Sequence, residues 1–147
     1  MVLAFFGRDD GRPSPTTQFL ISKYGNGLDD NPKEISKIFQ AWKFVLLRNG
    51  VCDGSNYLKK LSGYDAIEIR VKNSRTLIRF PFFLDNINDR IVLLLGFAKP
   101  EQYSKGGKID REVTRKLDES QLYYDEYKID NNKYNISDDI LLKFNKL

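Results

Sequence analysis

The stretch DAIEIRVKNSRTLIRFPFFLDNINDRIVLLLGFA, residues 65–98, has the pattern of three consecutive β-strands. Apolar and polar residues alternate over residues 67–72, which is typical of a strand with one buried face. Residues 76–83 form a second candidate strand, in which Pro81 indicates an edge position or a bulge. Residues 91–98 are uniformly apolar, as expected of a central strand covered on both faces. The short turns between these segments predict an antiparallel meander.

The clearest helix precedes this sheet. Asn31 is a good N-cap, Pro32 suits the first helical position, and Glu34 completes a start that resembles a capping box. The apolar positions that follow recur with a 3.6-residue period, and Trp42 lies on the apolar face as an expected core anchor. Gly50 is expected to end the helix as a C′ glycine.

Other segments complete the predicted secondary structure. Residues 2–6 indicate a short strand, residues 16–24 a short helix, and residues 109–127 a longer helix. The tail after this helix is rich in Asn and Asp, and it is expected to finish with a short helix capped by Ser137.

The order of these elements predicts an α+β fold in one domain over residues 1–147, with its core at about 32–127. The expected architecture is a small antiparallel sheet packed on one side by N-terminal helices and a C-terminal helix.

The composition excludes several classes of site. The 147 residues include no His and one Cys, so an internal disulfide, imidazole-based catalysis and nearly all zinc or haem sites are not expected. Cys52 lacks a His to activate it as a nucleophile. We therefore expect no metal and no cofactor. The longest apolar run, residues 91–98, is too short to span a bilayer, so a soluble cytoplasmic protein without membrane partners is expected.

Positive charge is concentrated in the middle of the chain. The formal net charge is +4, and residues 53–115 carry the whole excess, with 12 Lys and Arg against 8 Asp and Glu. Such a segment is compatible with a polyanionic partner, although charge alone favours the simpler interpretation of four surplus charges on a solvated surface. Arg70, Arg79 and Lys99 lie on successive predicted strands and are expected to converge on one surface.

Some of the basic residues also have a purely structural explanation. An arginine in an apolar strand needs a partner, and for Arg79 that partner is either an anionic ligand or Glu68 across the sheet. Lys59 and Lys60 are explained equally well as part of a solvated helix face.

Several short motifs in this region resemble the RelE/ParE toxin superfamily, and most closely its HigB-type, phage-derived subgroup. That subgroup typically has K-x-L-x-G, then E-L-R, then R-x-x-Y, and then an apolar strand that ends F-x-K-K. The corresponding segments here are residues 59–63, Glu68-Ile69-Arg70, Arg79 and Phe97-Ala98-Lys99. Two positions depart from the pattern: Phe82 replaces the tyrosine and Pro100 replaces the second lysine.

The resemblance implies a RelE-like fold and a toxin of a type II toxin–antitoxin pair that cleaves mRNA, usually on the ribosome. In this metal-independent reaction the RNA 2′-OH attacks the adjacent phosphorus, and the protein stabilises the extra charge. The implied catalytic residues are Arg79 as the main phosphate ligand, Arg70 as a second, Lys99 as an orienting or proton-donating group, and Tyr124. The implied RNA-binding residues are Lys59, Lys60, Lys72, Tyr123 and Tyr127. The implied partners are an antitoxin protein and ribosome-bound mRNA.

Two other functions remain open on the same fold. One is inhibition of DNA gyrase by a ParE-like protein that cuts no RNA. The other is a non-catalytic bacterial or phage protein that only binds a partner, which Phe82 and Pro100 favour. Arg79 and Lys99 favour the endoribonuclease.

Overall fold

The computed structural model describes residues 1–51, 57–73, 76–100 and 107–147, so Cys52 lies outside the described residues. The elements in chain order are β1 Val2–Phe6, α1 Pro15–Tyr24, α2 Pro32–Leu47, β2 Leu58–Lys60, β3 Ile67–Lys72, β4 Thr76–Asp85, β5 Arg90–Leu93, β6 Phe97–Pro100, α3 Lys108–Ile129, β7 Tyr134–Asn135 and α4 Asp139–Asn145. These bounds confirm the predicted strands and helices to within a few residues and confirm the α+β class.

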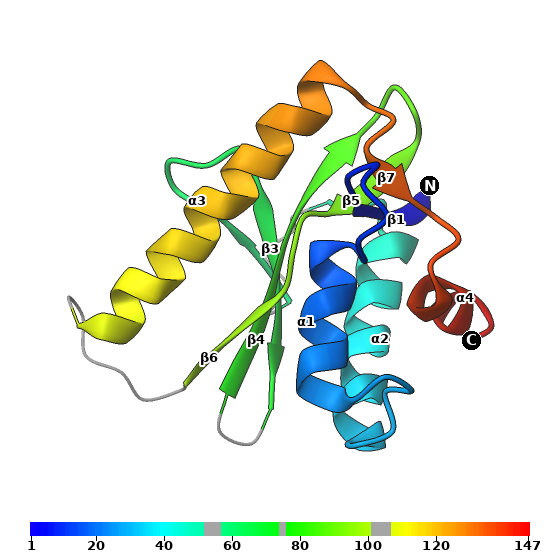
Figure 1. Ribbon diagram of the computed structural model, residues 1–147, viewed down its shortest axis with the longest axis vertical. Coiled ribbons are helices and arrows are strands. Elements are labelled where there is room, and N and C mark those ends of the chain that lie inside the picture. The colour runs from blue at the N-terminus through cyan, green and yellow to red at the C-terminus, as the bar shows by residue number, and fades with distance from the viewer. Residues whose placement is uncertain (52–56, 74–75, 101–106) are drawn as a thin grey trace.

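The described strands form one mixed sheet in the order β2-β3-β4-β5-β1-β7, and β6 also pairs with β4 (Figure 1). The predicted meander is confirmed, because β3, β4 and β5 pair antiparallel in sequence order. β1 lies beside β5 and runs parallel to it. The N-terminal strand is therefore in the interior of the sheet, with β7 from the C-terminal tail on its other side.

The predicted strand over residues 91–98 is interrupted by a bulge. Phe82 lies opposite Leu93, whereas Arg79 lies opposite Phe97, so three residues on one strand face two on the other. Pro81 is at this point in β4, and its carbonyl accepts the N–H of Leu94 at 2.8 Å. The extra residue lies in the strand across from Pro81 and not in β4 itself. Of the two positions that Pro81 indicated, the edge is wrong, because β4 pairs on both sides, and the bulge is found opposite the proline, which offers no N–H to the ladder.

Helices cover both faces of the sheet, which corrects the expectation of helices on one side. α1, α2 and α4 pack on one face, where Ile69, Phe80 and Leu93 join the core around Trp42. α3 covers the opposite face and packs on a second core that includes Phe83. The reason is visible in the central strands, where consecutive residues are apolar and each face of the sheet needs a cover.

The start of α2 is as predicted, and its end differs by one residue. The Asn31 side chain accepts the N–H of Glu34 at 3.2 Å, and Pro32 occupies the first helical position. At the other end the C′ residue is Asn49, with a left-handed φ of 54°, and its N–H donates to Leu46. Gly50 follows at C″ and donates to the Val45 carbonyl, which completes a Schellman motif.

The C-terminal tail is more ordered than its composition suggests. Tyr134 pairs with Phe6, so part of the tail is the edge strand β7. α4 begins after Asp138 and not after Ser137, because the Asp138 carboxylate accepts the N–H of Ile140 at 2.8 Å. The same carboxylate accepts the Thr17 hydroxyl at 2.6 Å, which ties α4 to α1.

Candidate nucleic-acid interface

The strand register brings three of the predicted site residues onto one face of the sheet. Arg70 of β3 lies opposite Arg79 of β4, and Arg79 lies opposite Phe97 of β6. Lys99 follows two residues after Phe97 and faces Leu77, two residues before Arg79. Because side chains alternate along a strand, Arg70, Arg79 and Lys99 all point to the face that α3 covers. Their predicted convergence is confirmed.

Two further lysines belong to this face and one does not. Lys59 pairs with Glu68, and Lys72 lies two residues after Arg70, so both share its orientation. Lys60 pairs with Ile67, which packs against the core on the opposite face, so Lys60 points away. Both Lys59 and Lys60 belong to the strand β2 and not to the helix face that was the alternative interpretation. We call Lys59, Arg70, Lys72, Arg79 and Lys99 the cationic sheet face.

Glu68 is the acidic partner of the two arginines on this face. Its carboxylate is fully buried and lies 2.5 Å from the guanidinium of Arg79, and Arg70 Nε lies 3.8 Å away. The Arg79 side chain is 7% exposed and its Cζ lies 5.2 Å from the centre of the Phe97 ring. The Glu68 partner that the sequence left open for Arg79 is therefore present. Arg70, with 38% of its side chain exposed, is the arginine that reaches solvent.

The three predicted tyrosines of α3 lie away from the cationic sheet face. Tyr124 contacts Phe83 edge to face at 4.9 Å. Phe83 is four residues beyond Arg79 on β4, a separation of about 13 Å. The structure therefore does not bring Tyr124 to the phosphate ligands that the resemblance implies. The reason is the way α3 crosses the sheet, which places its last turns over β1 and the end of β4.

The other two tyrosines are buried and hydrogen-bonded. Tyr123 stacks on Phe6 with ring centres 4.7 Å apart, and burial together with a hydrogen bond to Glu119 raises the pKa of Tyr123 to about 12. Tyr127 donates to Asp85 at 2.5 Å, and burial together with this bond raises the pKa of Tyr127 to about 12. Neither ring presents a face on which a base could stack.

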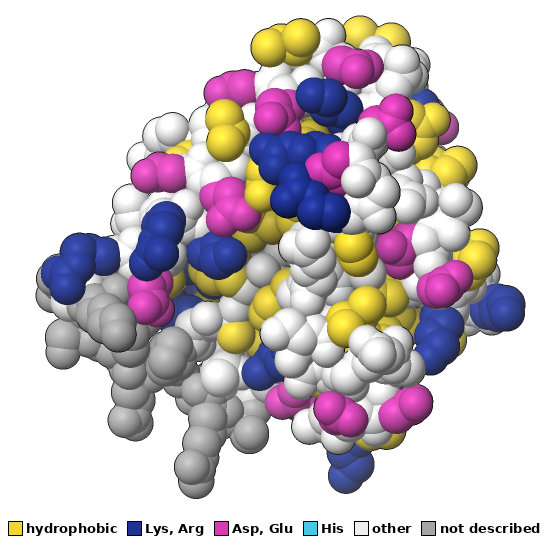
Figure 2. All heavy atoms as spheres, viewed as in Figure 1, with side chains coloured by type: hydrophobic (Ala, Val, Ile, Leu, Met, Phe, Trp, Pro, Cys, Tyr) yellow, Lys and Arg dark blue, Asp and Glu magenta, His cyan; other side chains and the backbone are white. Residues whose placement is uncertain are grey.

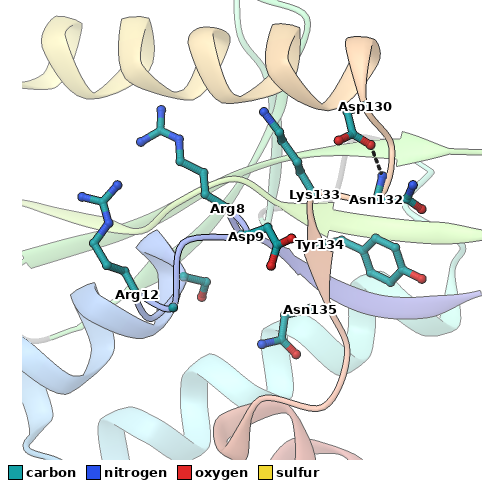
Figure 3. Close-up of a pocket in the computed structure, with 11 residues that line it drawn as sticks. Arg8, Asp9, Arg12, Asp130, Asn132, Lys133, Tyr134 and Asn135 are labelled. Carbon is teal, nitrogen blue, oxygen red and sulfur yellow. Dashed lines mark hydrogen bonds between the residues drawn. The ribbon is translucent and has the colours of Figure 1, made fainter.

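A second polar region, which the sequence analysis did not identify, lies between the loop after β1 and the loop before β7. It is a cavity of about 520 Å³ whose lining includes Arg8, Arg12 and Lys133 (Figure 3). Asp9 and Asp130 line the same cavity. Figure 2 shows Lys and Arg side chains gathered between α3 and the loop after β1, with acidic side chains around them. The only signal in the sequence was the Gly- and charge-rich segment after β1.

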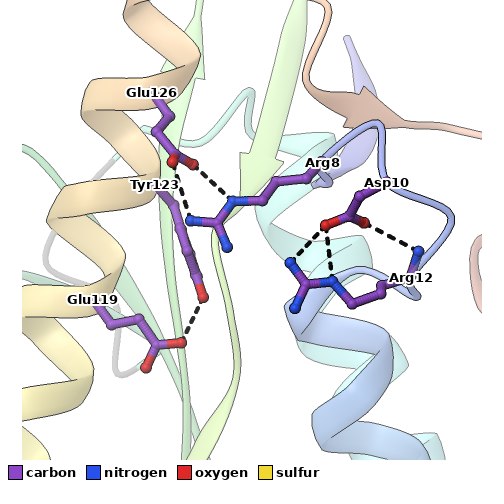
Figure 4. Close-up of polar contacts among 6 residues, drawn as sticks. All are labelled: Arg8, Asp10, Arg12, Glu119, Tyr123 and Glu126. Carbon is purple, nitrogen blue, oxygen red and sulfur yellow. Dashed lines mark hydrogen bonds and ion pairs between the residues drawn. The ribbon is translucent and has the colours of Figure 1, made fainter.

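Two of these cations, Arg8 and Arg12, form ion pairs with carboxylates (Figure 4). Arg8 makes two hydrogen bonds to Glu126, at 3.0 and 3.1 Å, and its guanidinium lies over the Tyr123 ring. The hydrogen bonds to Glu126 raise the pKa of Arg8 above its ordinary value. Arg12 pairs with Asp10. The Arg8–Glu126 pair fixes the loop after β1 to α3, whereas the Arg12–Asp10 pair lies within the loop. Both pairs compensate positive charge, so this region has less excess positive charge than the cationic sheet face.

Among the described residues no three His, Cys, Asp or Glu side chains are grouped so as to hold a metal ion. None of the described helices is both long and apolar enough to cross a bilayer.

Comparison with known proteins adds no assignment. No protein-family model matches the chain, and no curated protein matches it. The structure itself shows an α+β protein with helices on both sides of a mixed sheet and with the cationic sheet face on the side that α3 covers.

Proposed function

We propose that the protein is the toxin of a toxin–antitoxin pair and that it cleaves mRNA on the ribosome, in the cytoplasm. The observation that carries the proposal is the cationic sheet face, where four neighbouring strands place five Lys and Arg side chains on one side of the sheet. Two of them, Arg70 and Arg79, share the buried carboxylate of Glu68. A surface of this sign favours phosphate, and an arginine fork binds a phosphate through two parallel hydrogen bonds.

The reaction needs groups that this face supplies and water as the proton acceptor. The RNA 2′-oxygen attacks the adjacent phosphorus and its proton passes to water. The bond from phosphorus to the 5′-oxygen breaks, and the products are a 2′,3′-cyclic phosphate and a 5′-OH. Arg70 is the exposed guanidinium and stabilises the charge on the phosphorane, while Lys99 donates a proton to the leaving 5′-oxygen.

Arg79 acts from behind this surface in our proposal. Its side chain is nearly inaccessible and pairs with Glu68, so it does not itself bind the phosphate. Its role is to help position Arg70 and to add positive charge near the phosphate. Tyr124 is too distant to take part, and the tyrosines at 123 and 127 serve the core.

The experiment that tests this function is RNA end-mapping. A defined mRNA is incubated with the purified protein, with and without translating ribosomes. New 5′-OH ends are expected, and their dependence on ribosomes identifies the substrate. If no new ends form in either mixture with a protein that circular dichroism shows to be folded, the protein is not an endoribonuclease.

The burial of Arg79 favours a second candidate, a protein of the same fold that binds a partner and cuts nothing. In this case the cationic sheet face would serve as the docking surface for an acidic partner. The antitoxin of the first proposal would use the same charge complementarity. The end-mapping experiment separates the two candidates, because only the first forms 5′-OH ends.

A further inference from the structure

A hollow opens at the edge of the sheet, where α2 packs against β3. The residues that line it are Lys37, Gln40, Tyr57, Arg70, Val71 and Lys72, and we call it the β3 hollow. Its volume is about 430 Å³. Sites for small molecules usually have roughly 300–1,000 Å³, so the β3 hollow has the volume of such a site.

The described residues that line the β3 hollow carry charge of one sign. Lys37 from α2 and Arg70 and Lys72 from β3 are its charged residues, and none of the described residues that line it carries a carboxylate. This distinguishes it from the cavity beside β1, where acidic side chains accompany the basic ones. The β3 hollow therefore favours a phosphate-bearing ligand.

An aromatic ring accompanies these cations. Tyr57 is 37% exposed, and its ring contacts that of Phe44 with centres 5.0 Å apart and a tilt of 49°. The guanidinium of Arg48 lies over the Phe44 ring. The backbone holds the residue in place as well, since the Tyr57 carbonyl accepts the N–H of Arg70 at 2.7 Å. A ring that is supported from behind and partly open to solvent is a surface on which a base can stack.

The β3 hollow and the cationic sheet face share residues. Arg70 and Lys72 belong to both, so an RNA strand bound at Arg70 has a cationic path over the edge of β3 to Lys37. Gln40 adds an amide that can donate to and accept from the edge of a base.

We infer that the β3 hollow binds a nucleotide of single-stranded RNA next to the phosphate held at Arg70, with the base on Tyr57 and the backbone phosphates at Lys37 and Lys72. This inference rests on the proposed function, because it takes RNA to be the polyanion that the sheet face binds. It gives an RNA-binding role to Lys37, Gln40 and Tyr57, which the sequence analysis did not identify as site residues.

The test is fluorescence anisotropy with a short, labelled, single-stranded 2′-O-methyl RNA, which lacks the attacking hydroxyl and stays intact. Tyr57→Ala is expected to weaken binding about tenfold, while Tyr57→Phe keeps the ring and stays within about twofold of the wild type. Lys37→Gln is expected to reduce the slope of log K against log salt by about 0.7. The matched control is Lys23→Gln on α1, which makes the same charge change outside the hollow and is expected to bind like the wild type.

The outcomes separate this inference from the proposed function. If the wild type binds the RNA and Tyr57→Ala and Lys37→Gln both behave like Lys23→Gln, the β3 hollow is not an RNA site. The same conclusion follows if the wild type cleaves mRNA on ribosomes but does not bind the short RNA. If Tyr57→Phe is as weak as Tyr57→Ala, stacking is not the role of the ring. The proposed function is decided separately, by the 5′-OH ends. Circular dichroism confirms that each variant folds.

Discussion

Glu68 is completely buried beside the guanidinium of Arg79. Glu68→Gln keeps the shape of the side chain and removes its charge, which leaves the Arg79 cation buried without a counter-charge. We expect this variant to lose about 3–5 kcal/mol of unfolding free energy, measured by urea denaturation. The control is the double variant Glu68→Leu/Arg79→Met, which removes both charges and is expected to recover most of the loss. A loss below about 1 kcal/mol in Glu68→Gln would show that Arg79 does not depend on this partner.

Tyr127 makes stability sensitive to alkaline pH. Its pKa is raised to about 12 in the folded protein by burial and by the bond to Asp85. The ordinary value is about 10, so the folded state holds the proton more tightly, and this contribution is complete below pH 10. It is lost as the pH rises from about 10 to 12.

Tyr127→Phe is therefore expected to reduce the fall of unfolding free energy in this range by about 1.4 kcal/mol per pH unit. The measurement is urea denaturation at a series of pH values. Tyr123, whose pKa is also raised to about 12 by burial and its bond to Glu119, remains in the variant and keeps part of the slope. An identical slope in the wild type and the variant would contradict the account of Tyr127.

At the scale of the element, Gly96 lies in the bulge between β5 and β6, where there is no room for a side chain. A Cβ built at this position would lie 2.6 Å from Phe19 and 2.8 Å from Phe80, both part of the packing under α1. Gly96→Ala is expected to destabilise the fold by about 1–3 kcal/mol, seen as a lower Tm. The control is Gly7→Ala, where the nearest atom outside its chain neighbours lies at an ordinary 3.9 Å. Equal Tm values for the two variants would show that close packing does not require a glycine at the bulge.

The elements that local patterns specify were predictable from the sequence. The alternation in β3 and the cap at Asn31 each depend on a few neighbouring residues, and the structure agrees with both. Pro81 indicated an edge or a bulge, and the bulge lies in the strand across from it. The position of β1 beside β5 depends on contacts between segments almost 90 residues apart, which no local pattern records. The edge strand β7 was also missed. It has only two residues, Tyr134 and Asn135, and it is defined by its pairing with the distant β1.

The candidate site was predictable to the same extent. Alternation along β3 and β4 places Arg70 and Arg79 on one face, and this follows from sequence once the strands are known. The opposed orientations of Lys59 and Lys60 required that β2 be recognised as a strand. The distance of Tyr124 from Arg79 depends on how α3 crosses the sheet, which is a property of tertiary packing.

On the scale of the whole molecule, the cationic sheet face is expected to dominate binding to RNA. Lys59→Ala is expected to reduce the slope of log K against log salt by about 0.7, because Lys59 lies on the same face as Arg70. Lys60→Ala makes the same change one residue away on the opposite face and is expected to leave the slope unaltered. Anisotropy titrations of labelled RNA over a range of salt measure both. Equal slopes for the two variants would contradict the assignment of faces.

The most direct measurement of the central claim is the rate at which 5′-OH ends appear on a defined, ribosome-bound mRNA with the wild type, Arg70→Ala and Arg12→Ala. Arg12 is an exposed arginine that pairs with Asp10 outside the cationic sheet face, so it matches the change in charge and size. We expect Arg12→Ala to cleave like the wild type and Arg70→Ala to be slower by at least about a hundredfold. Cleavage by Arg70→Ala at the wild-type rate would contradict the claim that this face of the sheet carries out the reaction.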